Sequence, residues 1–456
     1  MTARGLILAA PASGSGKTLV TAGLLRHLRR RGVRVAAAKA GPDFIDPTFH
    51  AAASGRPCIN LDPWAMRRQT LAGLVAGLET SAEIVLCEGV MGLFDGTGAD
   101  GEAGSTAELA MITGWPVVLV VDARGQGASV AALLRGFAGH RPELPLAGVV
   151  FNRVASQRHR ALLLDAVRRH LPGLDILGAL PADPALALPS RHLGLVPAGE
   201  SAAAEAAIER AAGLAGAALD IDRLLRLAQP STIGVTAAAA GIPPLGQCIA
   251  VARDDAFGFS YPALLDRWRR SGADVSFFSP LADEAPDTAA DAVYLPGGYP
   301  ELYAVQLAAA DALRAGLRRA GAAGKPVYGE CGGYMMLGEG LIDADGRRLP
   351  MAGLLPLVAS FAERRLSLGY RETALLADGP LGIAGARFRG HEFHYATVIR
   401  ESENGAGPLW SAADAAGLGL GSRGLRRGSV FGSFIHLIDG SPTLARSPNS
   451  IEAVAR

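Results

Sequence analysis

Short apolar segments alternate with longer amphipathic ones along the first 200 residues of this 456-residue chain. Six mostly apolar runs, each bounded by Gly, Pro or charged residues, predict strands at 5–10, 33–38, 83–88, 116–121, 146–151 and 175–180. Residues 19–30 predict a helix, because their apolar positions recur with the helical period and Gly32 follows them. Strands that are apolar throughout indicate a parallel sheet covered by helices on both faces.

A second series of strand-like runs follows a break in this pattern. Residues 202–219 are rich in Ala and predict a helix, and the residues from there to 245 show no period, so we predict a linker at 226–245. Strand-like runs then resume at 248–254, 273–279, 291–298, 325–333, 386–395 and 429–437. The two series share no motif, so the sequence predicts two different α/β domains, at 1–225 and 246–456.

Composition narrows the class of protein. Hydrophobic residues make up 49% and charged residues 19% of the chain, which favours an ordered globular protein over a disordered one. The net charge of +1 gives no electrostatic reason to expect nucleic acid or an anionic membrane as a partner. Four scattered cysteines suggest neither a disulfide framework nor a zinc site, and no apolar stretch is long enough to cross a membrane. We therefore expect a cytoplasmic protein that acts on small molecules.

A phosphate-binding loop is predicted between the first strand and the first helix. Residues 11–18 read PASGSGKT, and Pro11 stands where the usual pattern G-x-x-x-x-G-K-[ST] has its first glycine. Gly14 and Gly16, where the closest approach to phosphate is needed, are both present. Small residues would let backbone N–H groups surround phosphate oxygens at the N-terminus of the helix. The expected nucleotide-binding residues are Ser13, Gly14, Ser15, Gly16, Lys17 and Thr18; a plain Gly/Ser turn is the alternative.

Three carboxylates are expected near this loop. Asp43 and Asp46 lie in a Pro-bounded loop after Lys39, and Glu88 ends a predicted strand, at the edge where open α/β sheets bind ligands. A Mg²⁺ ion bound to phosphates takes one or two protein carboxylates. We therefore predict that all three acids take part in phosphoryl transfer, although an acidic loop without a ligand would also explain the first two. The expected metal ligands are Thr18, Asp46 and Glu88.

Two further positions complete the predicted nucleotide site. Lys39 is expected to contact the phosphates. Asn152, with Arg153, follows the strand at 146–151 and could contact the adenine, but Asn152 could equally cap the strand. Asp95 is interpreted as a turn residue.

A second reactive centre is predicted in the later half of the chain. The run GECGG around Cys331 follows a strand and precedes a helix, which is the arrangement of a nucleophile elbow. His436, at the end of an apolar run, is the predicted base. The N–H groups of Gly298 and Gly332 are predicted to form an oxyanion hole. A small buried cysteine and a plain turn at 296–301 are the alternatives.

These residues carry a family resemblance. Cys331 in GECGGY and His436 in SFIHL resemble the class I glutamine amidotransferases, in which the cysteine attacks glutamine and ammonia is released from the acyl-enzyme. Members usually have a Glu two residues after the His, where this chain has Ile438, followed by Asp439. The resemblance therefore leaves two possibilities, a role for Asp439 or a Cys-His dyad.

The whole chain resembles the cobyrinic (or hydrogenobyrinic) acid a,c-diamide synthase family. The shared motifs, in the family's order, are APASGSGKT, KAGPDFIDP, EGVMGLFDG, FNRV, LPGGYPEL, GECGGYM, LGYRE, RGHEFHY and SFIHL. The first half is similar to dethiobiotin synthetase. The resemblance thus implies a P-loop parallel-sheet domain followed by a class I glutamine amidotransferase-like domain.

The resemblance also implies a reaction. It is the amidation of the a and c acetate side chains of a corrinoid, with ATP and Mg²⁺ to activate each carboxylate and glutamine to supply ammonia, in an enzyme that could be a homodimer. The residues that the resemblance suggests for corrinoid binding are Tyr370, Arg371, Arg389, His391 and His394. The alternatives are an enzyme of the cobyric acid synthase type, amidation of a sirohydrochlorin, and a regulatory P-loop ATPase with an inactive amidotransferase domain.

Overall fold

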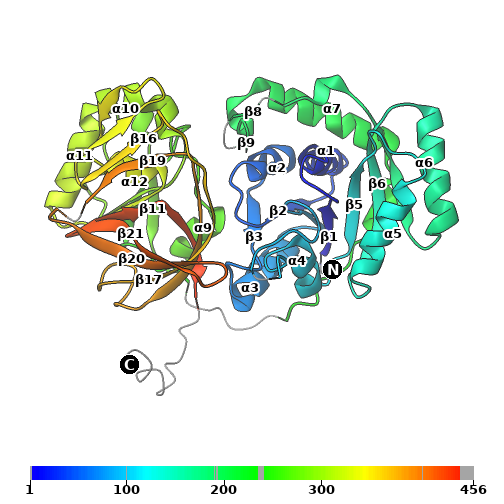
Figure 1. Cartoon of the computed structure of the whole chain (residues 1–456), viewed down its shortest axis with the longest axis horizontal. Helices are drawn as coiled ribbons and strands as arrows, with labels where there is room; N and C mark the ends of the chain where they lie inside the picture. The colour runs from blue at the N-terminus through cyan, green and yellow to red at the C-terminus, as the bar shows by residue number, and fades with distance from the viewer. Residues whose placement is uncertain are drawn as a thin grey trace, which may run out of the picture. The chain divides into compact units, whose positions relative to one another are not determined.

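The chain folds into two compact units, which are described separately (Figure 1). The computed structural model describes residues 3–98, 100–188, 190–191, 194–234, 241–402 and 404–441. The first unit comprises Met1–Ala239 and Phe259–Arg267, and the second comprises Ala240–Gly258 and Trp268–Arg456. Each unit combines helices with a large sheet, so the predicted α/β fold class is confirmed.

The first unit is built on a seven-stranded sheet in the order β3-β2-β4-β1-β5-β6-β7, and every neighbouring pair is parallel. Its strands are β1 (Arg4–Ala9), β2 (Val35–Ala40), β3 (Cys58–Leu61), β4 (Ile84–Glu88), β5 (Val117–Asp122), β6 (Leu146–Val154) and β7 (Asp175–Pro181). All six predicted strands are present. Strand β3 was not predicted, because its four residues, CINL, form too short a run and include a polar Asn.

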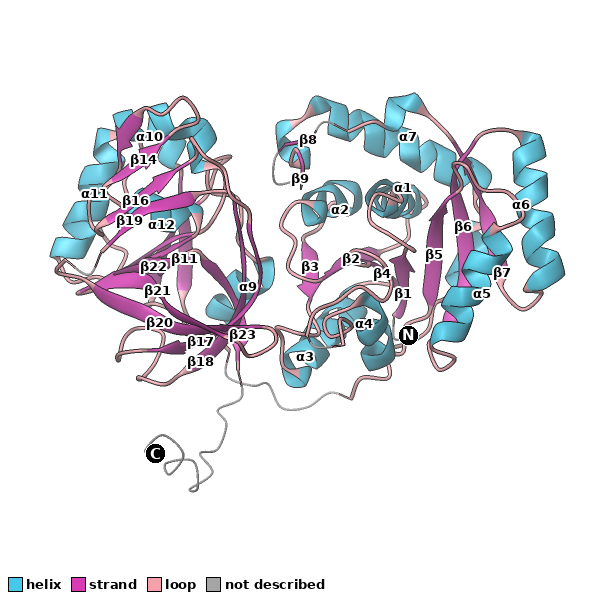
Figure 2. Ribbon diagram, in the orientation of Figure 1, coloured by secondary structure: helices cyan, strands magenta, loops and turns pink. Residues whose placement is uncertain are grey.

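Helices cover both faces of this sheet, as the apolar strands predicted (Figure 2). They are α1 (Lys17–Arg30), α2 (Asp46–Ser54), α3 (Arg68–Ser81), α4 (Thr106–Thr113), α5 (Val130–His140), α6 (Gln157–His170), α7 (Ala202–Ala218) and α8 (Ile221–Leu227). Right-handed crossovers place α1 and α2 on one face and α3 to α6 on the other. Short elements between β7 and α7 are η1 (Pro184–Leu186), β8 (Ser190–Arg191), β9 (Gly194–Leu195) and η2 (Ala198–Glu200).

The Ala-rich segment packs into the first unit. Helix α7 lies against α1, and the fit is so close that a Cβ at Gly23 would lie 2.8 Å from the carbonyl carbon of Ala211. Small side chains on both helices allow this approach of the two backbones. Residues 202–218 therefore help to form the first unit.

The second unit contains a ten-stranded mixed sheet in the order β11-β10-β12-β13-β22-β21-β20-β17-β18-β23. The strands from β11 to β22 in this order are parallel and those from β21 onward are antiparallel. Its strands are β10 (Cys248–Ala252), β11 (Asp274–Phe278), β12 (Ala292–Leu295), β13 (Val327–Glu330), β17 (Ser367–Leu375), β18 (Arg387–His394), β20 (Gly407–Asp414), β21 (Gly419–Arg427), β22 (Val430–Ser433) and β23 (Ile435–Gly440).

A four-stranded sheet and several helices complete the second unit. The sheet consists of β14 (Gly340–Ile342), β15 (Arg348–Pro350), β16 (Leu357–Ser360) and β19 (Thr397–Glu401). The helices are η3 (Pro280–Ala282), η4 (Pro300–Tyr303), α10 (Ala304–Ala309), α11 (Asp311–Ala322) and α12 (Gly332–Leu337). Helix α9 (Pro262–Arg270) begins in the segment that belongs to the first unit. No helix among the described residues has the length and apolar character needed to cross a membrane.

A row of buried aromatic rings crosses the parallel part of the large sheet. Trp268 packs edge-on against Tyr294, Tyr294 stacks on Tyr328, and Tyr328 stacks on Phe431, with ring centroids 4.9–5.7 Å apart. Tyr294 and Tyr328 are also register partners on β12 and β13. Stacking of this kind adds to the stabilisation from burial, so the carboxyl ends of these strands are rigidly supported.

Candidate active sites

The phosphate-binding loop connects β1 to α1 in the first unit. Gly14 and Gly16 have φ angles of 77° and 90°, which other residues rarely adopt, and Gly16 directly precedes the helix. A Cβ at Gly16 would lie 2.3 Å from the Asn152 Nδ2 atom, so only glycine fits this position. The proline-started loop therefore has the tight turn before a helix that phosphate binding requires.

Two residues at the end of β6 hold the loop through its carbonyl groups. The Asn152 amide donates to the Ser15 carbonyl at 2.9 Å, and the Arg153 guanidinium donates to the Gly14 carbonyl at 2.7 Å. Arg153 is fixed in turn by an ion pair of 2.6 Å with Asp122. The adenine contact predicted for Asn152 stays a prediction; its side chain reaches the loop and also lines a neighbouring cavity.

A buried cluster of charges lies beside the loop, as the topology dictates. Strands β1, β4 and β2 are neighbours, and Glu88 is in register with both Leu8 and Lys39. The Thr18 hydroxyl donates to Glu88 Oε1 at 2.9 Å, and Lys39 Nζ lies 3.1 Å from Asp46 and 3.7 Å from Glu88. The structure therefore brings together the residues that the sequence predicted for this site.

The charges of Lys39 and Glu88 support one another. Burial disfavours the charged form of Lys39, but the carboxylates of Glu88 and Asp46 raise its pKa above the ordinary value. Burial also disfavours ionised Glu88, yet Lys39 and His50 lower the pKa of this carboxyl to about 2. Lys39 is therefore a cation and Glu88 an anion at neutral pH. Asp43 has a different position, since its Oδ1 accepts hydrogen bonds from the N–H groups of Ile45 and Asp46 at the start of α2.

His50, a fully buried residue of α2, was not predicted as part of this site. Its Nε2 lies 2.6 Å from Glu88 Oε2. A single His three residues after a predicted acidic loop offers no spacing that would identify it. Only the packing of α2 against β2 and β3 brings it to the carboxylate. By holding one oxygen of Glu88, His50 directs the other toward Thr18.

Lys17 lies over the loop that follows β4. Its Nζ donates to the carbonyl of Met91 at 2.6 Å, and Met91 has a φ of 47°. Burial lowers the pKa of Lys17, although the nearby Glu88 opposes this shift. Asp95 accepts a hydrogen bond from the N–H of Gly92 at 2.8 Å, which confirms its interpretation as a turn residue.

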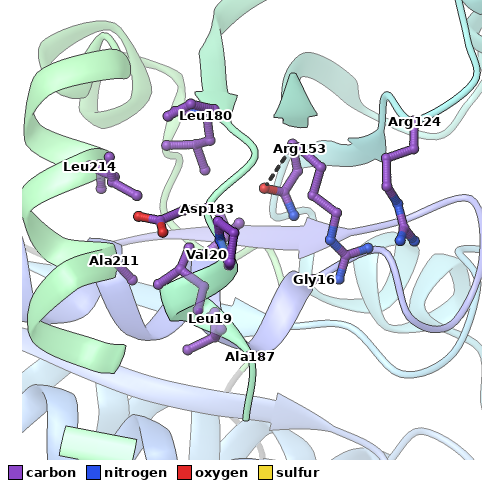
Figure 3. A pocket seen from close by; sticks show the side chains of 15 residues that line it. Gly16, Leu19, Val20, Arg124, Arg153, Leu180, Asp183, Ala187, Ala211 and Leu214 are labelled. Atoms are coloured by element: carbon purple, nitrogen blue, oxygen red, sulfur yellow. Dashed lines mark hydrogen bonds between the residues drawn. The ribbon is translucent and has the colours of Figure 1, made fainter. Parts of the chain in front are cut away.

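Two adjoining cavities open around these residues. The larger, of about 570 Å³, is lined by the phosphate-binding loop and by Lys39, Asp43, Asp46 and Glu88. The smaller, of about 230 Å³, is lined by apolar residues together with Asn152, Arg153 and Asp183. Figure 3 shows Ala211 and Leu214 of α7 on one side of the smaller cavity and Arg124 and Arg153 on the other. Both cavities include Gly16, Leu19 and Arg153 in their walls, so they are contiguous.

The second unit contains the elbow predicted around Cys331. The residue lies between β13 and α12 with φ 47° and ψ −103°, a strained backbone conformation for a residue with a side chain. A Cβ at Gly329 would lie 2.7 Å from the carbonyl carbon of Gly333, and a Cβ at Gly333 would lie 2.0 Å from the Leu295 carbonyl oxygen. Both glycines are thus needed for the tight turn that presents Cys331.

The loop after β12 lies between the elbow and His436. A Cβ at Gly297 would lie 2.3 Å from the Cε1 atom of His436, and a Cβ at Gly332 would lie 3.0 Å from the backbone N of Gly298. His436 belongs to β23, which joins the far edge of the sheet. The structure therefore brings Gly298, Gly332 and the imidazole to one place beside Cys331.

Both reactive groups are neutral in this environment. Burial raises the pKa of the Cys331 thiol above its ordinary value, and the charge of Glu301 adds to the effect. Burial, together with the nearby His391 and His394, lowers the pKa of His436 to about 3. A neutral imidazole can accept a proton, so this arrangement suits attack by a thiol that loses its proton during the reaction.

The candidates for corrinoid binding lie on β17 and β18, and β18 pairs with the strand that carries His436. Arg371 and His394 both contact Glu392, at 2.7 and 2.9 Å, and His394 stacks on Phe434. His391 is the register partner of His436 and packs against Tyr370. Since β18 is a regular strand, His391 and His394 point to opposite faces. Corrinoid binding by these residues stays a prediction.

Replacing Gly297 by alanine should disrupt the geometry of the second site. The new methyl group would collide with the His436 ring, and misplacement of a reacting group by about 1 Å can cost about 100-fold in rate. We expect glutamine hydrolysis to fall about 100-fold in Gly297→Ala, while amidation with ammonium ion is unchanged. Gly407→Ala is the control, because a Cβ at Gly407 meets no atom within 4 Å. Equal glutaminase rates in the two variants would contradict the inferred contact.

Comparison with known proteins agrees with this arrangement of sites. Residues 6–196 match the CobQ/CobB/MinD/ParA nucleotide binding domain, and residues 248–443 match the CobB/CobQ-like glutamine amidotransferase domain. A crystal structure of a glutamine amidotransferase aligns with 42% of this chain and with 90% of its own chain, at 16% sequence identity. The TM-score of 0.28 is too low to indicate a shared fold. The two family matches define a nucleotide-binding, glutamine-hydrolysing enzyme that forms amides, as the sequence analysis expected.

Near full-length relatives identify the family. The chain is 54% identical over 439 residues to the hydrogenobyrinate a,c-diamide synthase of Rhizobium meliloti (strain 1021), covering 95% of this chain and 99% of that protein. It is 53% identical to the proteins of the same name from Brucella abortus and Rhodobacter capsulatus, covering 96% of this chain in each case. The chain belongs to the hydrogenobyrinate a,c-diamide synthase family.

Proposed function

We propose that this chain converts the a and c acetate side chains of hydrogenobyrinic or cobyrinic acid to amides, a step of cobalamin biosynthesis, using ATP and glutamine. The observation that carries the proposal is a similarity that covers both units. The chain is 54% identical, over 95% of its length, to a hydrogenobyrinate a,c-diamide synthase. The two domain matches, over residues 6–196 and 248–443, extend across the phosphate-binding loop and across the segment from Cys331 to His436.

The two cavities of the first unit fit the two ends of ATP. The polyphosphate would occupy the larger cavity, where loop N–H groups, Lys17 and Lys39 supply positive charge. The adenosine would extend into the smaller, more apolar cavity beside Asn152 and α7. Gly16 lines both cavities, so the two parts of the nucleotide would meet beside this residue.

The residues beside the loop also fit Mg²⁺. Their donors are the oxygen atoms of Thr18, Asp46 and Glu88, which suit this ion. Among the residues that the structure describes, no group of three or more acidic, His or Cys side chains could hold a metal by itself, so phosphate oxygens would have to complete the coordination. When bound, the ion would supply positive charge to the phosphates.

The first unit would activate the substrate carboxylate. A carboxylate oxygen attacks the γ-phosphorus of ATP, the bond to the β,γ-bridging oxygen breaks, and an acyl phosphate and ADP form. Ammonia then attacks the acyl carbon, phosphate leaves with the bonding electrons and takes up the proton that the nitrogen loses, and the amide results. Lys17 and Lys39 would stabilise the charge that develops on the transferred group. Asp43 would act here by fixing the start of α2, and hence Asp46.

The second unit would release ammonia from glutamine. The Cys331 sulfur attacks the side-chain carbonyl as its proton passes to His436, and the oxyanion is stabilised by the N–H groups of Gly298 and Gly332. His436 then returns the proton to the departing ammonia. Water hydrolyses the thioester to glutamate, with His436 again as the base.

Mass spectrometry of the reaction products tests the proposed substrate. Purified enzyme with ATP, Mg²⁺ and glutamine should change the mass of hydrogenobyrinic or cobyrinic acid by two replacements of OH with NH₂. Cobyrinic acid a,c-diamide and nickel sirohydrochlorin should remain unchanged. Amidation of the diamide would instead indicate the cobyric acid synthase reaction, and amidation of the sirohydrochlorin would indicate that macrocycle as substrate.

A further inference from the structure

A carboxylate that the proposed mechanism does not use is buried next to the elbow. Glu330 is the last residue of β13 and directly precedes Cys331, and it is 2% exposed. Its Oε1 accepts hydrogen bonds from the Tyr328 hydroxyl at 2.9 Å and from the backbone N–H of Leu437 at 3.0 Å. Its Oε2 accepts a hydrogen bond from the Tyr294 hydroxyl at 2.7 Å. Three donors on three different strands therefore fix the carboxylate in place.

The same carboxylate faces His436. The distance from Glu330 Oε2 to His436 Nδ1 is 3.7 Å, and Oε1 accepts from the N–H of Leu437, the residue that follows His436. One carboxylate thus accepts a hydrogen bond from the backbone next to the imidazole and faces the Nδ1 atom of its ring. A distance of 3.7 Å is longer than a hydrogen bond, but such contacts at catalytic groups often shorten when substrate binds.

Asp439, the carboxylate closest to His436 in sequence, has a different environment. It lies three residues further along β23, and the pairing of β23 with β18 is irregular between Leu437 and Asp439. Its Oδ1 accepts a hydrogen bond from the N–H of Gly440 at 2.9 Å. The measured approach of a carboxylate to the imidazole is that of Glu330, at 3.7 Å, so the inference is built on Glu330.

We propose that Glu330 is the positioning residue that orients His436, in place of the Glu that class I amidotransferases usually carry two residues after the catalytic His. This inference rests on the proposed roles of Cys331 and His436 in glutamine hydrolysis. The carboxylate holds a proton on Nδ1, so that Nε2 keeps the lone pair that takes the thiol proton. It also stabilises the imidazolium that exists until the proton is passed to the departing ammonia. Glu330 itself neither gains nor loses a proton in this sequence.

The charged state of Glu330 gives the inference a distinctive readout. Burial raises the pKa of the Glu330 carboxyl to about 7, although the N–H of Leu437 and the two tyrosine hydroxyls oppose the shift. His436, with a pKa near 3, stays neutral around this pH, and the thiol of Cys331 stays protonated. The other titratable groups that affect these three residues are Glu301, His391, Glu392, His394, Tyr294 and Tyr328. Because only the ionised carboxylate can support the imidazolium, glutaminase kcat/KM should rise as the pH increases through about 7.

The isosteric variant Glu330→Gln tests the proposal. The amide of the variant would direct an N–H toward Nδ1 or leave Nδ1 without support. Loss of a group that orients a functional His typically reduces activity about 10- to 100-fold. We therefore expect glutaminase kcat/KM to fall by about 100-fold. The rise through pH 7 should disappear, so the variant's profile should be flat between pH 6 and 8. Amidation with ammonium ion should remain at the wild-type rate. Glu363→Gln, at an exposed position of the same unit, is the control for the substitution itself.

A second variant moves the pH dependence in a predicted direction. The Tyr294 hydroxyl bonds to the ionised carboxylate and lowers the pKa of Glu330. In Tyr294→Phe this support is absent, so the rise in glutaminase activity should shift to higher pH and still reach a plateau. A purely structural role of Glu330 would reduce activity at all pH values alike and would also affect ammonia-dependent amidation.

The outcomes separate this inference from the proposed function. If Cys331→Ala and His436→Gln abolish glutamine hydrolysis but Glu330→Gln keeps the wild-type rate and pH profile, only the role of Glu330 is wrong. If Cys331→Ala still hydrolyses glutamine, the proposed function of the site itself fails. If Glu330→Gln does not fold, ¹⁵N NMR of the wild-type enzyme can show which ring nitrogen of His436 carries the proton. The His436 signal is assigned by its absence from the spectrum of His436→Gln. A proton on Nδ1 supports the proposal, and a proton on Nε2 overturns it.

Discussion

Cys331→Ala is expected to stop the use of glutamine while leaving the use of ammonium ion intact. Removing a catalytic nucleophile can cost a factor of 10⁴ or more, so we expect glutamine-dependent amidation to fall at least about 10⁴-fold. The ammonia-dependent rate should remain near that of the wild type, because the phosphate-binding loop and its carboxylates lie in the other unit. Both rates follow from mass spectrometry of the amidated macrocycle, with glutamine or ammonium chloride as the nitrogen source.

The matched control is Cys248→Ala, at a partly exposed cysteine of β10 in the same unit. This variant should behave as the wild type with either nitrogen source. Loss of both activities in Cys331→Ala would show that the elbow also supports the synthetase reaction. Retention of both would remove Cys331 from the mechanism.

Lys17→Ala is expected to reduce amidation with both nitrogen sources. Lys17 lines the larger cavity at the end of the phosphate-binding loop, and its ammonium would meet the charge that develops during phosphoryl transfer. Loss of one such electrostatic contact costs up to about 10³-fold, and we expect a decrease of this size. Formation of ADP that depends on the macrocycle, measured with ammonium chloride as the nitrogen source, should fall in parallel.

The chain provides a natural control for this variant, because it contains only three lysines. Lys325 lies in the second unit, where its Nζ donates to the carbonyls of Thr288 and Ala290. Lys325→Ala should keep the wild-type amidation rate. A normal rate in Lys17→Ala would refute the proposed contact between Lys17 and the phosphates.

The first unit followed from its sequence because its strands are buried on both faces. Such strands are continuous apolar runs, and all but β3 were recognised by this pattern. Because β2, β4 and β1 are adjacent and parallel, the phosphate-binding loop, Lys39 and Glu88 all lie at the edge of the sheet where these strands end. Contacts made by packing, such as that between His50 and Glu88, have no counterpart in the sequence.

The second unit was harder to predict. Its antiparallel strands β17, β20 and β21 carry arginines, glycines and exposed positions, so their residues show no continuous apolar run. The elbow could be predicted because its glycines are local to Cys331. The position of Glu330 opposite His436 could not, since the two residues are far apart in the chain and meet only through the order of strands in the sheet.

The burial of Cys331 also bears on its sensitivity to oxidation. Oxidation by peroxide and alkylation both proceed through the thiolate, and burial keeps the sulfur of Cys331 in the thiol form. If Cys331 is the nucleophile, its sulfur would become reactive when glutamine binds and the imidazole takes its proton. We therefore expect peroxide to oxidise Cys331 more slowly in the resting enzyme than it oxidises an exposed thiolate.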